Sequence, residues 1–277
     1  MQSSIDIVTF YDEHPINLSE ILSRAKDSGL ALDSLKAEDL WRWDQDHYGG
    51  LDAVDALLQA LEINSRSLVI DLCSGMGGPA RYLATKTGCQ VHGVDLNASR
   101  VDGANELTAR VKLDHLVSFS CADICALPVA DNSFNCAMSQ EAFLHIEDRE
   151  SLLAQIHRVL EPGSKFGFTD WIAGDSLSES HRERFASTFA AGRIVSADEY
   201  TRLLEAAGFR VEGVTDLSAL WKKILVERLE MFRSLEKETV EKFGQLRHDT
   251  YISNYEFFVE RITCSDLGGA RIISTAI

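Results

Sequence analysis

The sequence has few prolines, no long apolar run and fewer basic than acidic residues. Four prolines in 277 residues are too few for a proline-rich linker. No apolar run approaches the roughly 20 residues that cross a bilayer, which argues against a membrane protein. The 27 basic residues against 43 acidic ones give a net charge of −16, and such a surface repels nucleic acid. We therefore expect partners other than membranes or nucleic acid.

The cysteines and the N-terminus also lack specific signals. The six cysteines show no paired CxxC spacing, so we expect buried free thiols and no metal site. The opening stretch, MQSSIDIVTFYDEHP, has no basic region followed by an apolar core, which favours a cytoplasmic location. We expect a monomer or a homodimer.

Hydrophobic patterning divides the chain into a helical start and an α/β remainder. Residues 1–60 read as an N-terminal helical cap, because their apolar positions follow helical spacing. From residue 67 short apolar runs alternate with helical segments, which predicts a doubly wound, mainly parallel sheet with helices on both faces. Within this core (residues 61–277), helical excursions at about 176–194 and 220–262 are expected to cover the ligand edge of the sheet.

The stretch LVIDLCSGMGGPARYL runs from a predicted strand into glycines and then a helix. Gly75 and Gly77 suit a tight turn that lets a ligand approach the backbone. Because Ala80 is a permitted substitute for the third glycine of a dinucleotide fingerprint, the glycines alone do not separate the possible nucleotide ligands.

Three acids at successive strand ends narrow the ligand. A carboxylate at Asp71 would oppose a pyrophosphate at the helix N-terminus, whereas it suits S-adenosylmethionine, which carries an ammonium and a sulfonium but no phosphate. Asp95 follows about 20 residues later and can accept both ribose hydroxyls. Asp123 is placed to receive the adenine amino group, and Ile124 can pack on the ring.

Four ordered motifs, DLCSGMGGPAR, HGVDLN, ADICALPVADNSFN and RVLEPGSKFGFTD, resemble those of class I S-adenosylmethionine-dependent methyltransferases over about residues 51–216. WRWDQDHYGGLDAVDAL, SQEAFLHIEDRESLL and DLGGARI resemble the small-molecule subgroup that includes sarcosine/dimethylglycine N-methyltransferases. The resemblance implies a Rossmann-like, seven-stranded sheet. It also implies methyl transfer from S-adenosylmethionine to a small polar acceptor, with an amine nitrogen as the favoured acceptor atom. S-adenosylhomocysteine would be the product, and no metal would be required.

Oxygen, sulfur or carbon of a small secondary metabolite is the alternative methyl acceptor. A nicotinamide-dependent oxidoreductase and a non-catalytic cofactor-binding protein are more remote alternatives. The residues expected at the cofactor are Tyr48, Asp71, Gly75, Gly77, Asp95, Leu96, Asn97, Arg100, Asp123, Ile124 and Ser139.

The segment after the fourth predicted strand supplies the candidate catalytic residues Gln140, Glu141 and His145, because strand ends meet at the binding edge. Helical i,i+4 spacing would put Glu141 and His145 on one face, where they are either substrate contacts or a surface pair. His145 could act as general base and Glu141 could attract an ammonium, although a neutral amine needs no base.

Aromatic and basic residues in the flanks are the candidates for the acceptor site. Tryptophans can stabilise a methylated nitrogen through cation–π contacts, although each also suits a core position, and Arg193 could bind a carboxylate. The substrate-binding candidates are Trp43, His47, Trp171, Arg193, Trp221 and Tyr251, with Tyr255 and Arg271 as further ones.

Overall fold

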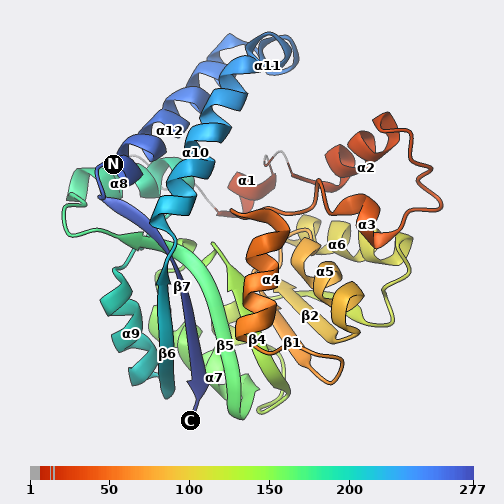
Figure 1. The fold of residues 1–277 in the computed structure, drawn as a ribbon, viewed down its shortest axis with the longest axis vertical. Helices are drawn as coiled ribbons and strands as arrows, with labels where there is room; N and C mark the ends of the chain where they lie inside the picture. Colours follow the sequence, from red (N-terminus) through yellow and green to blue (C-terminus); the bar gives the residue numbers. More distant parts are fainter. Residues whose placement is uncertain (1–6, 13, 15) are drawn as a thin grey trace.

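The computed structural model describes residues 7–12, 14 and 16–277. Its strands form one seven-stranded sheet in the order β3-β2-β1-β4-β5-β7-β6 (Figure 1). They are β1 (Leu68–Leu72), β2 (Gln90–Asp95), β3 (Val117–Cys121), β4 (Phe134–Gln140), β5 (Leu160–Ala173), β6 (Phe209–Asp216) and β7 (Leu267–Ala276). Strands β1 to β5 pair in parallel, and β7 runs antiparallel to both of its neighbours. The predicted fold class is therefore confirmed.

Helices precede, connect and cap these strands. The α-helices are α1 (Ile7–Asp12), α2 (Leu18–Asp27), α3 (Ala37–Leu40), α4 (Gly50–Ala60), α5 (Gly78–Thr87), α6 (Ala98–Arg110), α7 (Arg149–Val159), α8 (Glu179–Phe189), α9 (Ala197–Ala206), α10 (Ser218–Ser234), α11 (Glu236–Phe243) and α12 (Gln245–Thr263). Two 3-10 turns are η1 (Ile124–Ala126) and η2 (Phe143–His145). Of the residues described, none lies in a helix long and apolar enough to cross a membrane.

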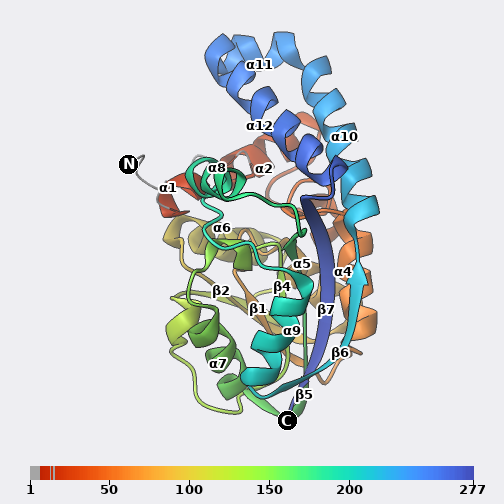
Figure 2. The ribbon, with the colours of Figure 1, turned by 90° about the vertical axis from the view of Figure 1, so that its left-hand side faces the viewer.

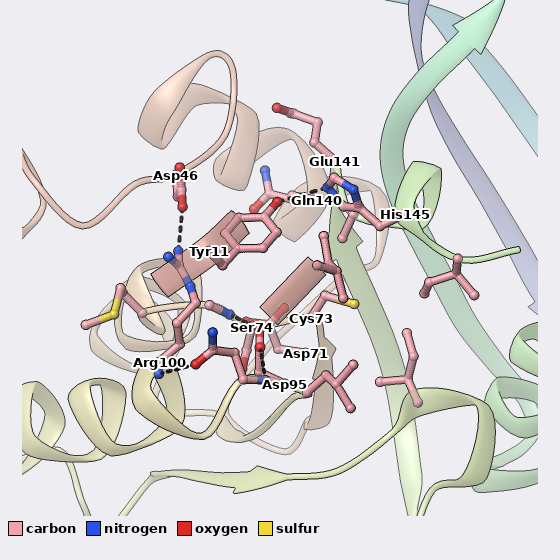
Figure 3. Close-up of a pocket in the computed structure, with 18 of the residues that line it drawn as sticks. Tyr11, Asp46, Asp71, Cys73, Ser74, Asp95, Arg100, Gln140, Glu141 and His145 are labelled. Carbon is pink, nitrogen blue, oxygen red and sulfur yellow. Dashed lines mark hydrogen bonds and ion pairs between the residues drawn. The ribbon is translucent and has the colours of Figure 1, made fainter. Parts of the chain in front are cut away.

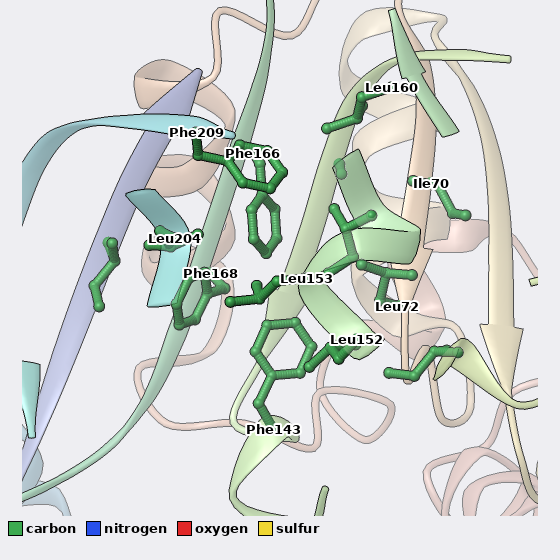
Figure 4. Packing of buried hydrophobic residues seen from close by; sticks show 14 of the residues in the cluster. Ile70, Leu72, Phe143, Leu152, Leu153, Leu160, Phe166, Phe168, Leu204 and Phe209 are labelled. Atoms are coloured by element: carbon green, nitrogen blue, oxygen red, sulfur yellow. The ribbon is translucent and has the colours of Figure 1, made fainter. Parts of the chain in front are cut away.

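Strand side chains alternate between the two faces of the sheet, which gives a core on each face. On β1, Val69 packs in the cluster that includes residues of α4, α5 and α6, whereas Ile70 and Leu72 pack with α7 and α9. Figure 2 shows α4 on one side of the sheet and α7 and α9 on the other. Phenylalanines 166, 168 and 209 fill the second core together with leucines of α7 (Figure 4).

The excursions expected at about 176–194 and 220–262 contain α8 and the helices α10, α11 and α12. The last three, which we name the helical arm, project from the carboxyl-end edge of the sheet (Figure 1). Lys242 of the arm forms an ion pair with Glu20 of α2 at 2.8 Å. The arm and the N-terminal helices therefore meet above the edge where the parallel strands end, while the division of the chain at residue 60 stays a prediction.

Candidate active site

A cavity lies at the carboxyl ends of β1, β2 and β4, under the N-terminal helix α1 (Figure 3). Figure 3 shows the Tyr11 ring between Arg100 and His145, with Asp71 and Asp95 on one side and Gln140 and Glu141 on the other. The predicted residues that line it are His47, Asp71, Gly75, Asp95, Leu96, Asn97, Arg100, Asp123, Ile124, Gln140, Glu141 and His145.

The glycine turn is held by Asp95. Gly75 has φ +52°, and its N–H donates to Asp95 Oδ2 at 2.8 Å, while the N–H of Asn97 donates to Oδ1 at 2.9 Å. Gly77 has φ +74°, and a Cβ there would lie 2.3 Å from the Phe119 ring. Asp95 thus fixes the loop between β1 and α5 as well as facing the cavity, because each carboxylate oxygen has a second lone pair.

Polar atoms in the cavity lack partners within the described chain. Asp71 Oδ2, Ser74 Oγ and Gln140 Oε1 are buried without a hydrogen bond. Burial, with the nearby charge of Asp95, raises the pKa of Asp71 to about 8. Buried polar groups are normally paired, so these atoms fit a bound ligand that donates hydrogen bonds. A cofactor that carries an ammonium and hydroxyl groups meets this requirement.

Helix α1 is docked over the cavity by the start of α6. Asn97 Nδ2 donates to the carbonyl of Val8 at 3.2 Å and to Asp12 Oδ1 at 2.9 Å. The Arg100 guanidinium lies over the Tyr11 ring, 4.9 Å from its centroid, and pairs with Asp46. These contacts bring Tyr11 into the cavity from a position distant in sequence.

Tyr11 and His145 form a hydrogen-bonded pair in the cavity. The Tyr11 hydroxyl lies 2.9 Å from His145 Nε2, and His145 Nδ1 lies 3.0 Å from the carbonyl oxygen of Ala190. A carbonyl only accepts, so Nδ1 carries the proton and Nε2 accepts from Tyr11. Burial lowers the pKa of His145 to about 4, so the ring is neutral at pH 7 and its acceptor nitrogen faces the hydroxyl.

Gln140 is oriented by a histidine. His47 Nε2 lies 3.0 Å from Gln45 Oε1, and His47 Nδ1 lies 3.1 Å from Gln140 Nε2. Burial lowers the pKa of His47 to about 4, so the neutral ring donates to Gln45 and accepts from the Gln140 amide. This arrangement leaves Gln140 Oε1 free to accept a hydrogen bond from a ligand in the cavity.

Glu141 is a buried carboxyl group with few donors around it. The backbone N–H of Tyr48 donates to Oε2 at 2.8 Å, and the Thr169 hydroxyl lies 3.4 Å from Oε1. Burial raises the pKa of Glu141 well above its usual range, against the Tyr48 hydrogen bond and the charge of Arg228. A cationic ligand next to Glu141 would therefore stabilise the carboxylate form.

The chain between Glu141 and His145 differs from the predicted helix. Glu141 has φ +53°, and only η2 (Phe143–His145) is helical, as a 3-10 turn. The argument from i,i+4 spacing is therefore wrong, although both residues line the same cavity.

Buried polar residues hold the turn that carries His145. Arg149 donates to the carbonyl oxygens of Ile146 and Arg193, and the N–H of Arg193 donates to the Leu144 carbonyl. The Tyr200 hydroxyl donates to Asp170. Burial raises the pKa of Asp170 to about 6, and the positive charge of Arg149 opposes this rise. The buried charge of Arg149 thus favours the carboxylate form of Asp170.

Several predicted residues lie outside the cavity lining. Trp171 and Trp221 are 3% and 1% exposed and pack on the Tyr48 ring. They therefore occupy core positions, which was the alternative to a substrate contact. Arg193 forms ion pairs with Glu150 and Glu199 instead of facing the cavity. The others placed outside are Tyr48 against these tryptophans, Trp43 beside the α2–α3 cluster, Gly77 in the turn, Ser139 bonded to the Leu72 carbonyl, Tyr251 and Tyr255 against Phe232, and Arg271 within β7.

Tyr11, Asp46 and Cys73 line the cavity but were not assigned roles from the sequence. Tyr11 falls in the N-terminal stretch FYDEH, whose aromatic pair is the only sequence signal for it. In the chain as far as the structure describes it, no group of three or more His, Cys, Asp or Glu side chains is arranged to hold a metal.

Comparison with known proteins finds methyltransferases among the relatives of this chain. Residues 70–168 match a family model described as a methyltransferase domain. The chain is 30% identical to the methyltransferase GfsG of Streptomyces halstedii over 59% of this chain and 60% of that protein. It is 28% identical to the phosphoethanolamine N-methyltransferase of Plasmodium falciparum over 71% and 74% of the two chains. Other relatives are named as sterol C-methyltransferases and as a methyltransferase of 27-O-demethylrifamycin SV.

A solved structure agrees with this assignment at the level of the fold. Haemonchus contortus phosphoethanolamine N-methyltransferase 2, solved with phosphomonomethylethanolamine and S-adenosylhomocysteine, superposes with a TM-score of 0.79 at 24% identity, covering 98% of this chain and 60% of that one. Residues 70–168 thus match a methyltransferase domain, and the fold is that of class I, S-adenosylmethionine-dependent methyltransferases, as predicted. More particularly, the chain is similar to methyltransferases that act on small molecules.

Cofactor binding is expected to strengthen with pH and to release a proton. The Asp71 carboxyl of the free protein, with a pKa of about 8, is mostly protonated at pH 7, whereas a bound ammonium favours the carboxylate. We therefore expect the affinity for S-adenosylhomocysteine to rise between about pH 6 and pH 8. Calorimetric titration in two buffers of different ionisation enthalpy measures the protons released.

The Asp71→Asn variant is the control, because the ligand's own amino group also titrates. This variant should bind more weakly and lose the part of the proton release that belongs to the carboxyl. The same raised pKa affects folding. The contribution of Asp71 to the free energy of unfolding is present at acid pH and is lost as the pH rises through about 8. Equal proton release by both proteins would contradict the assignment.

Tyr200→Phe is expected to slow turnover without weakening cofactor binding. Loss of the hydroxyl leaves Asp170 with one donor fewer in a buried site, at a cost of about 1–3 kcal/mol in unfolding free energy. If the turn carrying His145 shifts, kcat should fall by about 10-fold. Tyr82→Phe is the matched control, because the Tyr82 hydroxyl donates to Asp55 at 2.8 Å on α4, outside the cavity lining. Equal kcat values for the two variants would show that Tyr200 is only structural.

Proposed function

We propose that this protein transfers a methyl group from S-adenosylmethionine to an amine nitrogen of a small polar acceptor. The observation that supports this choice is that Gln140 Oε1, which is buried without a partner, and the Glu141 carboxyl, which has few donors, line the same cavity. An amine offers the N–H donors and the positive charge that these groups lack, whereas a carbon acceptor offers neither.

The cofactor residues of this proposal are those that line the cavity. Asp71 would bind the amino group of the cofactor, Asp95 the ribose and Asp123 with Ile124 the adenine. When bound, S-adenosylmethionine would supply a sulfonium-borne methyl group to an in-line nucleophile, with S-adenosylhomocysteine as the leaving group. The protein contributes by excluding water under α1 and by holding the acceptor at a fixed distance and angle.

The Tyr11–His145 pair would move the proton that an amine must lose. An ammonium acceptor bound at Glu141 gives up its N–H proton to the Tyr11 oxygen, while the Tyr11 hydroxyl proton passes to His145 Nε2. The neutral ring of His145 offers Nε2 as the acceptor because its Nδ1–H is bonded to Ala190, and its pKa of about 4 makes it a weak base that holds the proton only transiently. An acceptor that arrives as the neutral amine would need this pair only for positioning.

Oxygen methylation is the second candidate, and the same pair supports it. A hydroxyl acceptor must lose its proton as the new bond forms, and a neutral His145, whose Nε2 accepts from the Tyr11 hydroxyl, can take that proton through Tyr11. The unpaired Gln140 Oε1 and the Glu141 carboxyl favour nitrogen, because a hydroxyl brings a single donor and no charge.

The proposal is tested with radiolabelled S-adenosylmethionine and a panel of small amines, alcohols, phenols and thiols. We expect label in amine products, and a Glu141→Gln variant that raises KM for amines while binding S-adenosylhomocysteine as the wild type does. His92→Ala, at the opposite edge of the sheet, is the variant expected to change neither value. Label found in oxygen or carbon products alone would overturn the choice of nitrogen.

A further inference from the structure

A buried ion pair behind the cavity anchors one carboxylate beside the glycine turn. Arg81 of α5 has no exposed surface, and its Nη2 donates to the Met76 carbonyl at 2.7 Å and to Asp44 Oδ2 at 2.9 Å. Its Nη1 donates to the Thr108 hydroxyl at 3.2 Å. Burial raises the pKa of Asp44, and the charge of Arg81 opposes this rise and favours the carboxylate. One oxygen of Asp44 is therefore committed to the guanidinium.

The other oxygen of Asp44 begins a line of hydrogen bonds that ends at the acceptor side of the cavity. Gln45 Nε2 donates to Asp44 Oδ1 at 2.7 Å, and Gln45 Oε1 lies 3.0 Å from His47 Nε2. His47 Nδ1 lies 3.1 Å from Gln140 Nε2. We call these residues, Arg81, Asp44, Gln45, His47 and Gln140, the Gln140 network. Asp44, His47 and Gln140 line the cavity.

The ion pair decides the direction of every hydrogen bond in the Gln140 network. A carboxylate only accepts, so Gln45 turns its NH₂ to Asp44 and its oxygen to His47. His47 Nε2 then carries the proton, and Nδ1 accepts from the Gln140 NH₂. The Tyr48 carbonyl, 3.4 Å from His47 Nδ1, favours the opposite tautomer, but this contact is long and has no charged partner. Gln140 Oε1 is thus left as the unpaired atom of the amide.

We propose that Asp44 is a positioning residue that acts through Gln45 and His47 to hold the Gln140 oxygen towards the methyl acceptor. This end of the cavity then selects acceptors that offer an N–H or O–H and disfavours groups that can only accept. The inference rests on the proposed function, in which Gln140 contacts the acceptor, and adds what sets the selectivity of that contact. An amide held the other way round would present its NH₂ and select the opposite groups.

The tautomers of two cavity histidines test this inference by heteronuclear NMR of the imidazole nitrogens in the full-length protein. Burial lowers the pKa of His47 and of His145 to about 4, so both rings are neutral at pH 7. We expect His47 as the Nε2–H form and His145, bonded to the Ala190 carbonyl, as the Nδ1–H form. Loss of one set of signals in His47→Gln identifies that ring. An Nδ1–H form of His47 in the wild type would overturn the inference.

Asp44→Asn is expected to reverse the Gln140 network. Because Arg81 only donates, the asparagine keeps its oxygen on the guanidinium and turns its NH₂ to Gln45. Gln45 then presents its NH₂ to His47, which must protonate at Nδ1 and turn the Gln140 NH₂ into the cavity. We expect this change of tautomer and a rise of about 10-fold in KM for the acceptor that takes the label. An unchanged tautomer, or a changed one with an unchanged KM, would contradict the proposal.

Asp55→Asn is the matched control for the loss of an acid. Asp55 of α4 accepts the Tyr82 hydroxyl at 2.8 Å outside the cavity lining. This variant should keep both the His47 tautomer and the KM of the wild type. The same change of tautomer in Asp55→Asn would show that the effect of Asp44→Asn is not specific, which would count against the network.

Gln45→Leu provides the test if Asp44→Asn fails to fold, because it leaves the buried ion pair with Arg81 in place. The substitution removes the oxygen that accepts from His47 Nε2. The backbone acceptor that remains at the ring is the Tyr48 carbonyl, so we expect His47 to change to the Nδ1–H form. A His47 ring that stays in the Nε2–H form would show that the network does not set its tautomer.

The NMR measurement needs no methyl acceptor, so it separates this inference from the proposed function. The expected tautomers, with label only in oxygen products and a KM for them that depends on Asp44, would leave the Gln140 network standing and remove amine methylation. Label in amines, with His47 of the wild type in the Nδ1–H form, would leave amine methylation standing and remove the network.

Discussion

His145→Ala is expected to lower the rate of methyl transfer by roughly 10²–10⁴-fold while leaving the affinity for S-adenosylhomocysteine within a few-fold. His145 Nε2 accepts the hydrogen bond of Tyr11, and burial keeps the ring neutral by lowering its pKa to about 4. Its removal takes away both the proton acceptor and the partner that holds Tyr11 over the cavity. Single-turnover kinetics with the acceptor identified by the labelled panel measures the effect.

Tyr11→Phe divides this effect into its two parts. The variant keeps the ring under Arg100, 4.9 Å from its centroid, but removes the hydroxyl that bonds His145. A rate as low as that of His145→Ala would indicate that the proton passes through the hydroxyl. His157→Ala, a histidine outside the cavity lining that contacts Phe209, should retain the wild-type rate. A wild-type rate in His145→Ala would contradict a role for the pair in the reaction.

The cofactor side of the cavity could be predicted because strand ends are local in sequence. In a parallel sheet the carboxyl ends of consecutive strands meet at one edge, so acids after three strands had to converge there. Asp71, Asp95 and Asp123 all line the cavity as expected. Asp95 also does something that the sequence did not indicate, since both of its oxygens hold the backbone of the glycine turn.

The acceptor side could not be predicted in the same way, because tertiary contacts form it. Tyr11 reaches the cavity only through the docking of α1 on Asn97 and Arg100, which no periodicity encodes. The left-handed backbone at Glu141 breaks the helical spacing on which its pairing with His145 was argued. The residue types on the acceptor side thus indicated a binding site, whereas the helical spacing assumed for them was not the spacing in the structure.

Large aromatic and basic side chains were the least predictable, since their type suits two environments. Trp171 and Trp221 can stack on a cation or fill a core, and here they pack with Tyr48. An arginine can bind a substrate anion or a neighbouring carboxylate. Arg193 has two carboxylates within 4.0 Å, which is the second of these environments.

Asp95→Ala is expected to weaken the binding of S-adenosylmethionine by about 10- to 100-fold. The substitution leaves the N–H groups of Gly75 and Asn97 without their acceptor, and unpaired donors in a partly buried site cost about 1–3 kcal/mol. The glycine turn is then free to leave the conformation that admits the ligand, and the oxygens proposed to accept from the ribose hydroxyls are lost as well. Calorimetric titration of the variant and the wild type measures the difference.

Asp102→Ala removes a nearby exposed acid on α6 and controls for the change in net charge. Asp95→Asn keeps the shape and one carbonyl oxygen, so it should restore part of the affinity if the loss comes from the turn. If Asp95→Asn binds no better than Asp95→Ala, both carboxylate oxygens are required, because the amide NH₂ replaces one of the two acceptors. Wild-type affinity in both Asp95 variants would show that neither the turn nor the ribose depends on this carboxylate.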